Sequence, residues 1–315
     1  MNALAPVTPE AGSIAHLWWI FFWTCVAVYC VVMAVILAAR WKHPDRAEPG
    51  QVVVTPAASE KRTRRIISAG AVATLLILLG LLTADLVAQR EVGPRNDNPL
   101  VVRIVGHQWW WGVEYQSPNA SDVFETANEV HVPVQRSIRL LLESNDVIHS
   151  FWVPELQGKK DLVPGHPAEL TFKIEKPGRY VGQCAEFCGY QHANMKIIIV
   201  ADEPRVYEQW AAHQKELAPP STTPTQIRGR EIFERGTCSM CHSARGTDAG
   251  SRLGPVLTHV ASRSSLAAGT LANTRENLAS WIVDPQHVKP GTLMPPTELS
   301  KTDLEALLDF METLR

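Results

Sequence analysis

The sequence predicts a multi-domain protein with an N-terminal transmembrane α-hairpin, an all-β domain and a C-terminal all-α domain. Two runs of uncharged residues, 17–39 and 66–84, are each about as long as a helix that crosses a bilayer. From about residue 99 the hydrophobic pattern changes to a period of two, which is typical of strands. A stretch rich in Pro, Ser and Thr at residues 218–224 then precedes a final segment with amphipathic helical stretches.

The composition narrows the class of protein before any motif is considered. A chain of 315 residues is long enough for about two domains, and 45% hydrophobic with 20% charged residues excludes a wholly disordered chain. The formal net charge is −2 and no basic low-complexity arm is present, so nothing favours nucleic-acid binding. Six cysteines are too few for a disulfide-stapled scaffold.

The uncharged runs are expected to form transmembrane helices at about 14–39 and 66–89, within an N-terminal region of residues 1–98. Two buried helices of a soluble core are the alternative, but such helices are seldom apolar on every face. Residues 1–13 contain no Lys or Arg and lack the basic start of a signal peptide. The segment between the runs is basic, which places it in the cytoplasm and the rest of the chain on the periplasmic side of a bacterial inner membrane. Its basic residues are Arg40, Lys42, Arg46, Lys61, Arg62, Arg64 and Arg65.

Residues 99–203 are expected to form the all-β domain. Four runs, at 100–105, 129–142, 168–175 and 195–200, indicate short strands that are separated by Pro- and Gly-containing turns. This spacing predicts an antiparallel sandwich or barrel.

The chemistry of this domain is concentrated in a single loop. Cys184 and Cys188 are four residues apart, His192 follows four residues later, and Met195 follows three after that. Thiolate, thioether and imidazole together favour copper, and a mononuclear blue-copper site uses only one Cys. The second thiolate therefore allows two sulfurs to bridge two copper ions, each capped by one imidazole, from His192 and the upstream His149.

Three other interpretations of this loop remain open. The two cysteines could form a disulfide, because residues four apart in a loop can meet that geometry. They could hold zinc together with His192. His192 and Met195 could also be ordinary packing residues.

Residues 14–203 resemble subunit II of the haem–copper cytochrome c oxidases, in which a cupredoxin fold carries the dinuclear copper centre CuA. The resemblance rests on the hairpin, the Cys loop, and the motifs at residues 106–111, 146–149 and 161–165. It implies copper ligands from His149, Cys184, the backbone carbonyl of Glu186, Cys188, His192 and Met195.

The same resemblance implies two further roles. The Glu186 carboxylate would reach a magnesium ion shared with subunit I. Trp109, the first of three consecutive Trp residues, would be the point at which electrons enter or are relayed. A hydrophobic patch against the membrane or subunit I is the alternative for this Trp cluster, and both roles are compatible with an aromatic ring.

Residues 226–315, after a linker at residues 204–225, carry a second chemical motif. Cys238, Cys241 and His242 form the Cys-x-x-Cys-His signature of c-type haem attachment, in which both thiols join the haem and the His ligates its iron. A bare Cys-x-x-Cys could be a redox dithiol or half of a zinc site, but no second Cys pair follows. The segment is therefore expected to bind haem c covalently.

This C-terminal segment resembles the small class I cytochromes c over about 90 residues. The resemblance implies that Met294, in a Pro-rich loop, is the distal iron ligand. His259 and His287 are the rival distal ligands. A Met ligand would give a higher haem potential than a second His.

Together these resemblances imply the electron-entry subunit of a caa3-type terminal oxidase. It would pass electrons from an external donor, such as a soluble or membrane cytochrome c, through haem c and CuA to haem a of subunit I. There oxygen is reduced to water and protons are pumped, so this chain would contain no oxygen-reducing site. The expected partners are subunit I, subunit III and membrane lipid, and no nucleic acid. The alternative is a membrane-anchored copper-delivery or assembly factor, which would need neither Met195 nor a fused haem domain.

Overall fold

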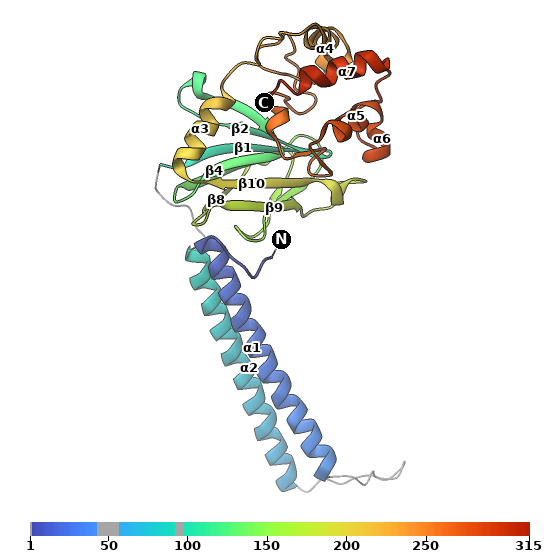
Figure 1. Ribbon diagram of the computed structural model, residues 1–315. Coiled ribbons are helices and arrows are strands. Elements are labelled where there is room, and N and C mark those ends of the chain that lie inside the picture. Colours follow the sequence, from blue (N-terminus) through green and yellow to red (C-terminus); the bar gives the residue numbers. More distant parts are fainter. Residues whose placement is uncertain (1, 43–56, 92–97) are drawn as a thin grey trace. The chain divides into compact units, whose positions relative to one another are not determined.

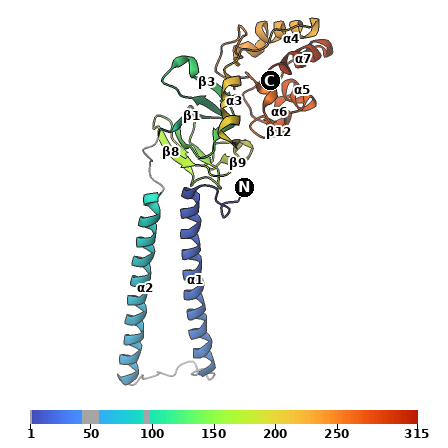
Figure 2. The same cartoon turned by 60° about the vertical axis from the view of Figure 1, so that its left-hand side comes forward.

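The described chain forms two compact units (Figures 1 and 2). A computed structural model describes residues 2–42, 57–91 and 98–315. One unit is Gly12–Gly93, and the other combines Met1–Ala11 with Pro94–Arg315. The predicted fold class, with apolar helices, a β-sandwich and a helical C-terminal domain, is confirmed.

Two long helices that run in opposite directions account for the first unit (Figure 1). α1 spans Pro9–Lys42 and α2 spans Ala57–Glu91. Each contains a stretch long and apolar enough to cross a membrane, and the most apolar part of each stretch is unburied, unlike a soluble core helix. Both helices continue past their apolar runs because the flanking Ala, Glu, Lys and Arg residues are good helix formers. Arg46 of the basic connection lies outside the described residues.

The second unit contains a β-sandwich of two five-stranded sheets. The strand orders are β3-β2-β1-β5-β8 and β4-β10-β9-β6-β7. The strands are β1 (Leu100–His107), β2 (Trp110–Tyr115), β3 (Phe124–Ala127), β4 (Glu129–Pro133), β5 (Ser137–Ser144), β6 (His149–Trp152), β7 (Lys160–Leu162), β8 (Ala168–Lys173), β9 (Gly178–Cys184) and β10 (Lys196–Asp202).

The sandwich differs in two ways from the one expected from the sequence. It is not purely antiparallel, because β1 pairs with β5, and β4 with β10, in parallel. The expected single strand at residues 129–142 is instead β4 and β5, which belong to different sheets. Gln135 between them has a φ of 61°, and the chain turns there from one sheet to the other.

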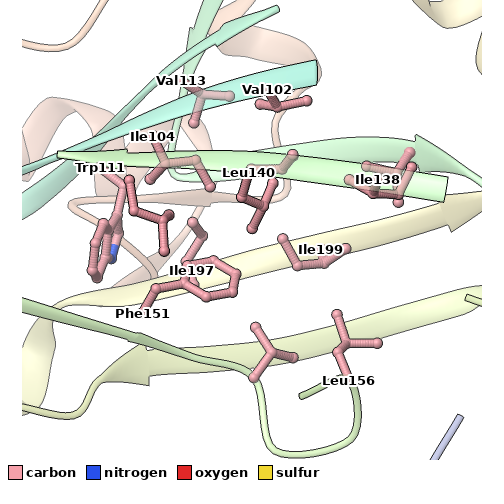
Figure 3. Close-up of a cluster of buried hydrophobic side chains, with 14 of the residues drawn as sticks. Val102, Ile104, Trp111, Val113, Ile138, Leu140, Phe151, Leu156, Ile197 and Ile199 are labelled. Carbon is pink, nitrogen blue, oxygen red and sulfur yellow. The ribbon is translucent and has the colours of Figure 1, made fainter. Parts of the chain in front are cut away.

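The core of the sandwich lies between the two sheets (Figure 3). Residues of β1 are alternately buried and half-buried, and the buried ones include Val102 and Ile104. From the opposite sheet, Ile197 and Ile199 of β10 extend into the same layer. Burial of apolar area stabilises this layer by about 25 cal/mol per Å². Because the layer is closely packed, it gives a rigid base to the loops at either end of the sandwich.

A helical domain follows α3 (Pro204–Gln214). Its elements are α4 (Pro224–Arg235), α5 (Arg275–Val283), α6 (Pro285–Val288), α7 (Lys301–Met311) and a short strand pair, β11 (Ser265–Leu266) with β12 (Leu271–Ala272). Thr223 and Gln226 form a reciprocal capping box at the start of α4. α4 packs closely on α7 because Gly229 has no side chain: a methyl group there would lie 1.9 Å from the carbonyl oxygen of Ala306.

Glu129 of β4 links the sandwich to this helical domain. Its carboxylate accepts hydrogen bonds from the backbone N–H and hydroxyl of Ser264, and Arg179 lies 3.3 Å away. Burial alone would raise the pKa of Glu129, but hydrogen bonds from His131 and Ser264 outweigh it and lower the pKa to about 2. The ionised carboxylate therefore stabilises the folded chain.

We expect Glu129 to contribute acid-sensitive stability. Because its folded pKa is lower than the ordinary 4.5, its contribution is complete above about pH 4.5 and is lost as the pH falls toward 2. Glu129→Gln should abolish this dependence, so that between pH 6 and pH 3 the wild type loses about 2 kcal/mol more stability than the variant. Denaturant unfolding of the full chain in detergent measures this, with exposed Glu208→Gln as the control. Parallel pH profiles for wild type and Glu129→Gln would contradict the assignment.

Candidate metal centre and haem site

The pairing of β6 with β9 brings sulfur and imidazole groups together at one end of the sandwich. His149 is the first residue of β6, Cys184 is the last residue of β9, and these two strands pair. Cys188 follows in the loop that leads to β10. The ligating atoms of these three residues all lie within 4.8 Å of one another, and all three side chains are buried. Among the described residues this is the one such group of His, Cys, Asp and Glu side chains.

Each sulfur has its own imidazole and its own weaker donor. Cys184 Sγ lies 3.8 Å from His149 Nδ1 and 3.2 Å from the backbone oxygen of Glu186. Cys188 Sγ lies 3.6 Å from His192 Nδ1 and 3.9 Å from Met195 Sδ. The structure thus brings together all six groups expected as copper ligands, in two matching halves.

The chemistry of this donor set fits copper better than the alternatives. Both cysteines are free thiols rather than a disulfide. Six donors exceed the four that a structural zinc ion takes, and two of them, a thioether and a carbonyl, are weak axial groups typical of copper sites. Cys184, Cys188 and Met195 also belong to the apolar core of the sandwich, so water is excluded around the sulfurs.

The two thiols differ strongly in acidity. The adjacent Cys188 thiol, by hydrogen bonding, lowers the pKa of Cys184, although burial acts in the opposite direction. Sharing that proton raises the pKa of Cys188. Cys184 is therefore the more acidic sulfur of the pair.

A carboxylate outside the donor set orients His149. Asp146 Oδ1 lies 2.8 Å from His149 Nε2, and the backbone N–H of Gln108 donates to the other carboxylate oxygen at 2.7 Å. Burial would lower the pKa of His149, but Asp146 and Cys184 outweigh it and raise the pKa. A ring whose Nε2–H donates to a carboxylate presents Nδ1 to a metal, the arrangement that fixes histidine ligands in metal sites.

Gly106 shapes the site, although the sequence analysis assigned it no role of its own. A methyl group at this position would lie 2.7 Å from Cδ2 of His149. The strand β1 therefore needs glycine here to leave room for the ligand ring. The only signal in the sequence was its place directly before the His107–Trp111 stretch.

Residues 184–195, which carry five of the six expected copper ligands, are called the ligand loop here. Trp109 packs on this loop rather than on an open surface. Its Nε1–H donates to the backbone oxygen of Cys188 at 2.9 Å, and Gln108 Nε2 donates to the same oxygen at 2.7 Å. The side chain is 9% exposed. A methyl group at Gly189 would lie 3.1 Å from the indole ring. This contact places the ring of Trp109 beside the backbone of Cys188, one of the expected copper ligands.

The two groups of Glu186 that are expected to bind metal ions lie in different surroundings. Its backbone oxygen lies toward Cys184, whereas its carboxylate is partly exposed and 3.3 Å from Lys159 Nζ. The carboxylate therefore lies outside the copper donor set, where a second ion would have to compete with Lys159.

The haem motif lies in a short helical turn of the C-terminal domain. Cys238 and Cys241 are partly exposed free thiols in and next to the turn Thr237–Met240. His242 Nδ1–H donates to the backbone oxygen of Pro255 at 2.7 Å, which leaves Nε2 available to iron. Burial lowers the pKa of His242, and this favours the neutral imidazole that a metal needs. A methyl group at Gly254 would lie 2.7 Å from the same ring.

The three rival distal ligands occupy different environments. Met294 is partly buried, and Gln286 Nε2 holds its loop by donating to the backbone oxygens of Met294 and Thr292. His259 is buried and its Nδ1 bonds to the backbone oxygen of Arg315 at the chain's end. His287 is exposed on α6. Nδ1 of His259 is engaged, but its buried Nε2 has no hydrogen-bond partner among the described residues. Met294 therefore stays a prediction that the resemblance implies.

Comparison with known proteins identifies the family. The family description "Cytochrome C oxidase subunit II, periplasmic domain" matches residues 100–202, and "Cytochrome c" matches residues 226–315. "Cytochrome c oxidase subunit 2" of Alkalihalophilus pseudofirmus is 32% identical over 320 residues, covering 100% of this chain and 91% of that protein. The chain belongs to the cytochrome c oxidase subunit 2 family.

A further relative and a solved structure are also similar to this chain. The subunit 2 protein of Bacillus sp. strain PS3 is 30% identical over 78% of this chain and 70% of its own length. The crystal structure of the periplasmic domain of subunit II (CoxB) of Bradyrhizobium japonicum covers 39% of this chain and 96% of its own, at 33% identity and a TM-score of 0.36.

Family membership fixes the coarse function of this subunit 2 chain. It is a membrane-anchored electron-entry subunit of an oxidase, and subunit I is its partner. The subunit II domain implies a CuA copper centre, and the cytochrome c domain implies haem. The resemblance on which the sequence prediction rested is therefore confirmed.

We expect the space left by Gly106 to be essential for copper binding. Gly106→Ala would force the His149 ring away from Cys184 and should lower copper content severalfold and alter the copper spectrum. Gly112→Ala is the matched control. Gly112 lies on β2, next to Trp111, which pairs with Gly106, and its methyl group would approach no atom closer than 3.4 Å. Metal analysis with optical and EPR spectra measures both. Equal copper spectra in the two variants would contradict the role of Gly106.

Proposed function

We propose that this chain passes electrons from an external donor through haem c and CuA to haem a of subunit I, in an oxidase that reduces oxygen to water and pumps protons. The observation that carries the proposal is the set of six donor groups around two buried sulfurs, in the same chain as the Cys238–His242 motif. The donor would be a soluble or membrane cytochrome c. The complex would include subunit III and lie in the inner (plasma) membrane of a bacterium, with both outer domains on the periplasmic side.

The residues of the copper end have distinct tasks in this proposal. Cys184 and Cys188 would bridge two copper ions, and His149 with His192 would cap them. Met195 Sδ and the Glu186 backbone oxygen would be the weak outer ligands. Because the sandwich core surrounds these groups, the ligands are held in nearly one geometry, and electron transfer then needs little rearrangement. Trp109 would couple the centre to its donor through the hydrogen bond to Cys188.

The haem end is proposed to work in a similar way. The thiols of Cys238 and Cys241 would be covalently joined to the haem, and His242 and Met294 would be its axial ligands. When bound, the copper pair and the haem supply one-electron redox chemistry, and this chain supplies their ligands and surroundings. A magnesium ion at the Glu186 carboxylate, shared with subunit I, completes the proposal and requires release of the Lys159 contact.

Replacing one bridging sulfur should abolish the copper pair while leaving the haem in place. Cys188→Ser is expected to remove the EPR signal of mixed-valence copper and to reduce oxidase activity by about 100-fold or more, since one half of the donor set is lost. Cys30→Ser, in α1, is the matched control. A wild-type chain that held a single labile Cu(I) would instead indicate copper delivery, the alternative function.

Met294 and its rivals can be separated by haem spectroscopy. Met294→Leu should leave the haem covalently attached, abolish the thioether-to-iron absorption band and lower the haem potential, by on the order of 100 mV. Met240→Leu is the matched control because Met240 is 68% exposed within the attachment turn. If instead a substitution of His259 or His287 changes the axial ligation, Met294 is not the ligand.

A further inference from the structure

Lys289, at the end of α6, is a buried cation that no proposed role yet uses. Lys289 is only 2% exposed, and a lysine that is buried to this extent needs hydrogen-bond or charge partners. Its Nζ donates to three backbone oxygens: those of Trp109 and Asn194, both at 2.7 Å, and that of Ala267 at 3.0 Å. Three acceptors match the three N–H bonds of an ammonium group.

These three acceptors belong to segments far apart in the sequence. Trp109 and Asn194 lie in the sandwich beside the copper ligands, whereas Ala267 lies between β11 and β12 in the haem domain. One side chain therefore ties both domains together next to Cys188. Burial lowers the pKa of Lys289 to about 7, and the nearby Cys188 acts in the opposite direction, in keeping with a position close to that residue.

The residues that follow Lys289 cover Trp109. The backbone oxygen of Pro290 accepts a hydrogen bond from Gln191 Nε2 at 2.7 Å. Gly291 adopts a φ of +83°, and a methyl group there would lie 3.7 Å from the Trp109 ring. The segment 289–291 thus rests on the ligand loop three residues before Met294.

We infer that Lys289 is a positioning residue that seats the haem domain on Trp109 and on the copper ligand loop. This inference rests on the proposed function. One electron would leave the reduced haem c and reduce the copper pair by one electron, with no proton or bond exchanged. The Lys289 ammonium is taken up by three backbone oxygens, so Lys289 would act by fixing the distance and orientation between the two groups. It also keeps Trp109 closed to other donors, which would have to enter through the haem domain.

Substitution of Lys289 by Met tests this positioning. Met has a similar length but cannot donate hydrogen bonds, so three buried carbonyls lose their partner and the seated arrangement is weakened. In the full chain in detergent, amide hydrogen exchange in segments 107–112 and 286–293 should accelerate about tenfold or more, and exchange in α4 and α7 should not change. Lys301→Met, an exposed lysine of α7, is the matched control. Unchanged exchange at both segments would overturn the inference.

Transient absorption of the assembled oxidase provides the functional readout. After photoreduction of haem c, its reoxidation by the copper pair should slow about tenfold or more in Lys289→Met, while the haem and copper spectra stay as in the wild type. Lys289→Gln, which can still donate two hydrogen bonds, should recover part of the rate. An unchanged rate in Lys289→Met overturns the inference but not the proposed function. A wild-type oxidase without mixed-valence copper overturns the proposed function, whereas the exchange experiment still tests the seating.

Discussion

The structure depends on one constraint: two soft sulfurs from a single loop must meet two imidazoles that come from different places in the chain. His149 precedes Cys184 by 35 positions and reaches it only because β6 and β9 pair in a fixed register. The loop from Cys188 to Met195 then closes the other half. Flexible ligands would let each metal charge state select its own geometry, so the packed sandwich beneath the site is part of its chemistry.

Residues that provide no ligand also determine the geometry of the site. Asp146 orients His149, Gly106 leaves room for its ring, and Trp109 with Gln108 holds the backbone oxygen of Cys188. The haem end repeats this plan on a smaller scale, where Pro255 orients His242 and Gly254 makes room for it. In both places a backbone or carboxylate oxygen fixes one ring nitrogen and leaves the other available, which is the general way in which proteins prepare histidine for a metal.

The sequence predicted the parts that depend on local spacing and not those that depend on distant contacts. The Cys loop and the Cys238–His242 motif are short and chemically distinctive, and period-two alternation located strands such as β5 and β8. The parallel pairing of β1 with β5 joins strands more than thirty residues apart, and alternation within a strand says nothing about which neighbour it takes. Lys289 likewise looks like an ordinary charged residue until the fold brings it to Trp109, 180 positions away.

Fusion of a haem domain to a copper domain can accelerate electron transfer in two physically different ways. A flexible linker alone raises the effective concentration of the donor to about the millimolar range, whatever orientation the domains adopt. The bonds of Glu129 with Ser264, Gln191 with Pro290 and Lys289 with its carbonyls instead select one orientation. Buried polar contacts of this kind add little net stability, since each must first lose its water, but they penalise misaligned arrangements in which a group stays unpaired. The contacts between the domains therefore serve orientation more than affinity, which is the property that the proposed electron transfer from the attached haem domain requires.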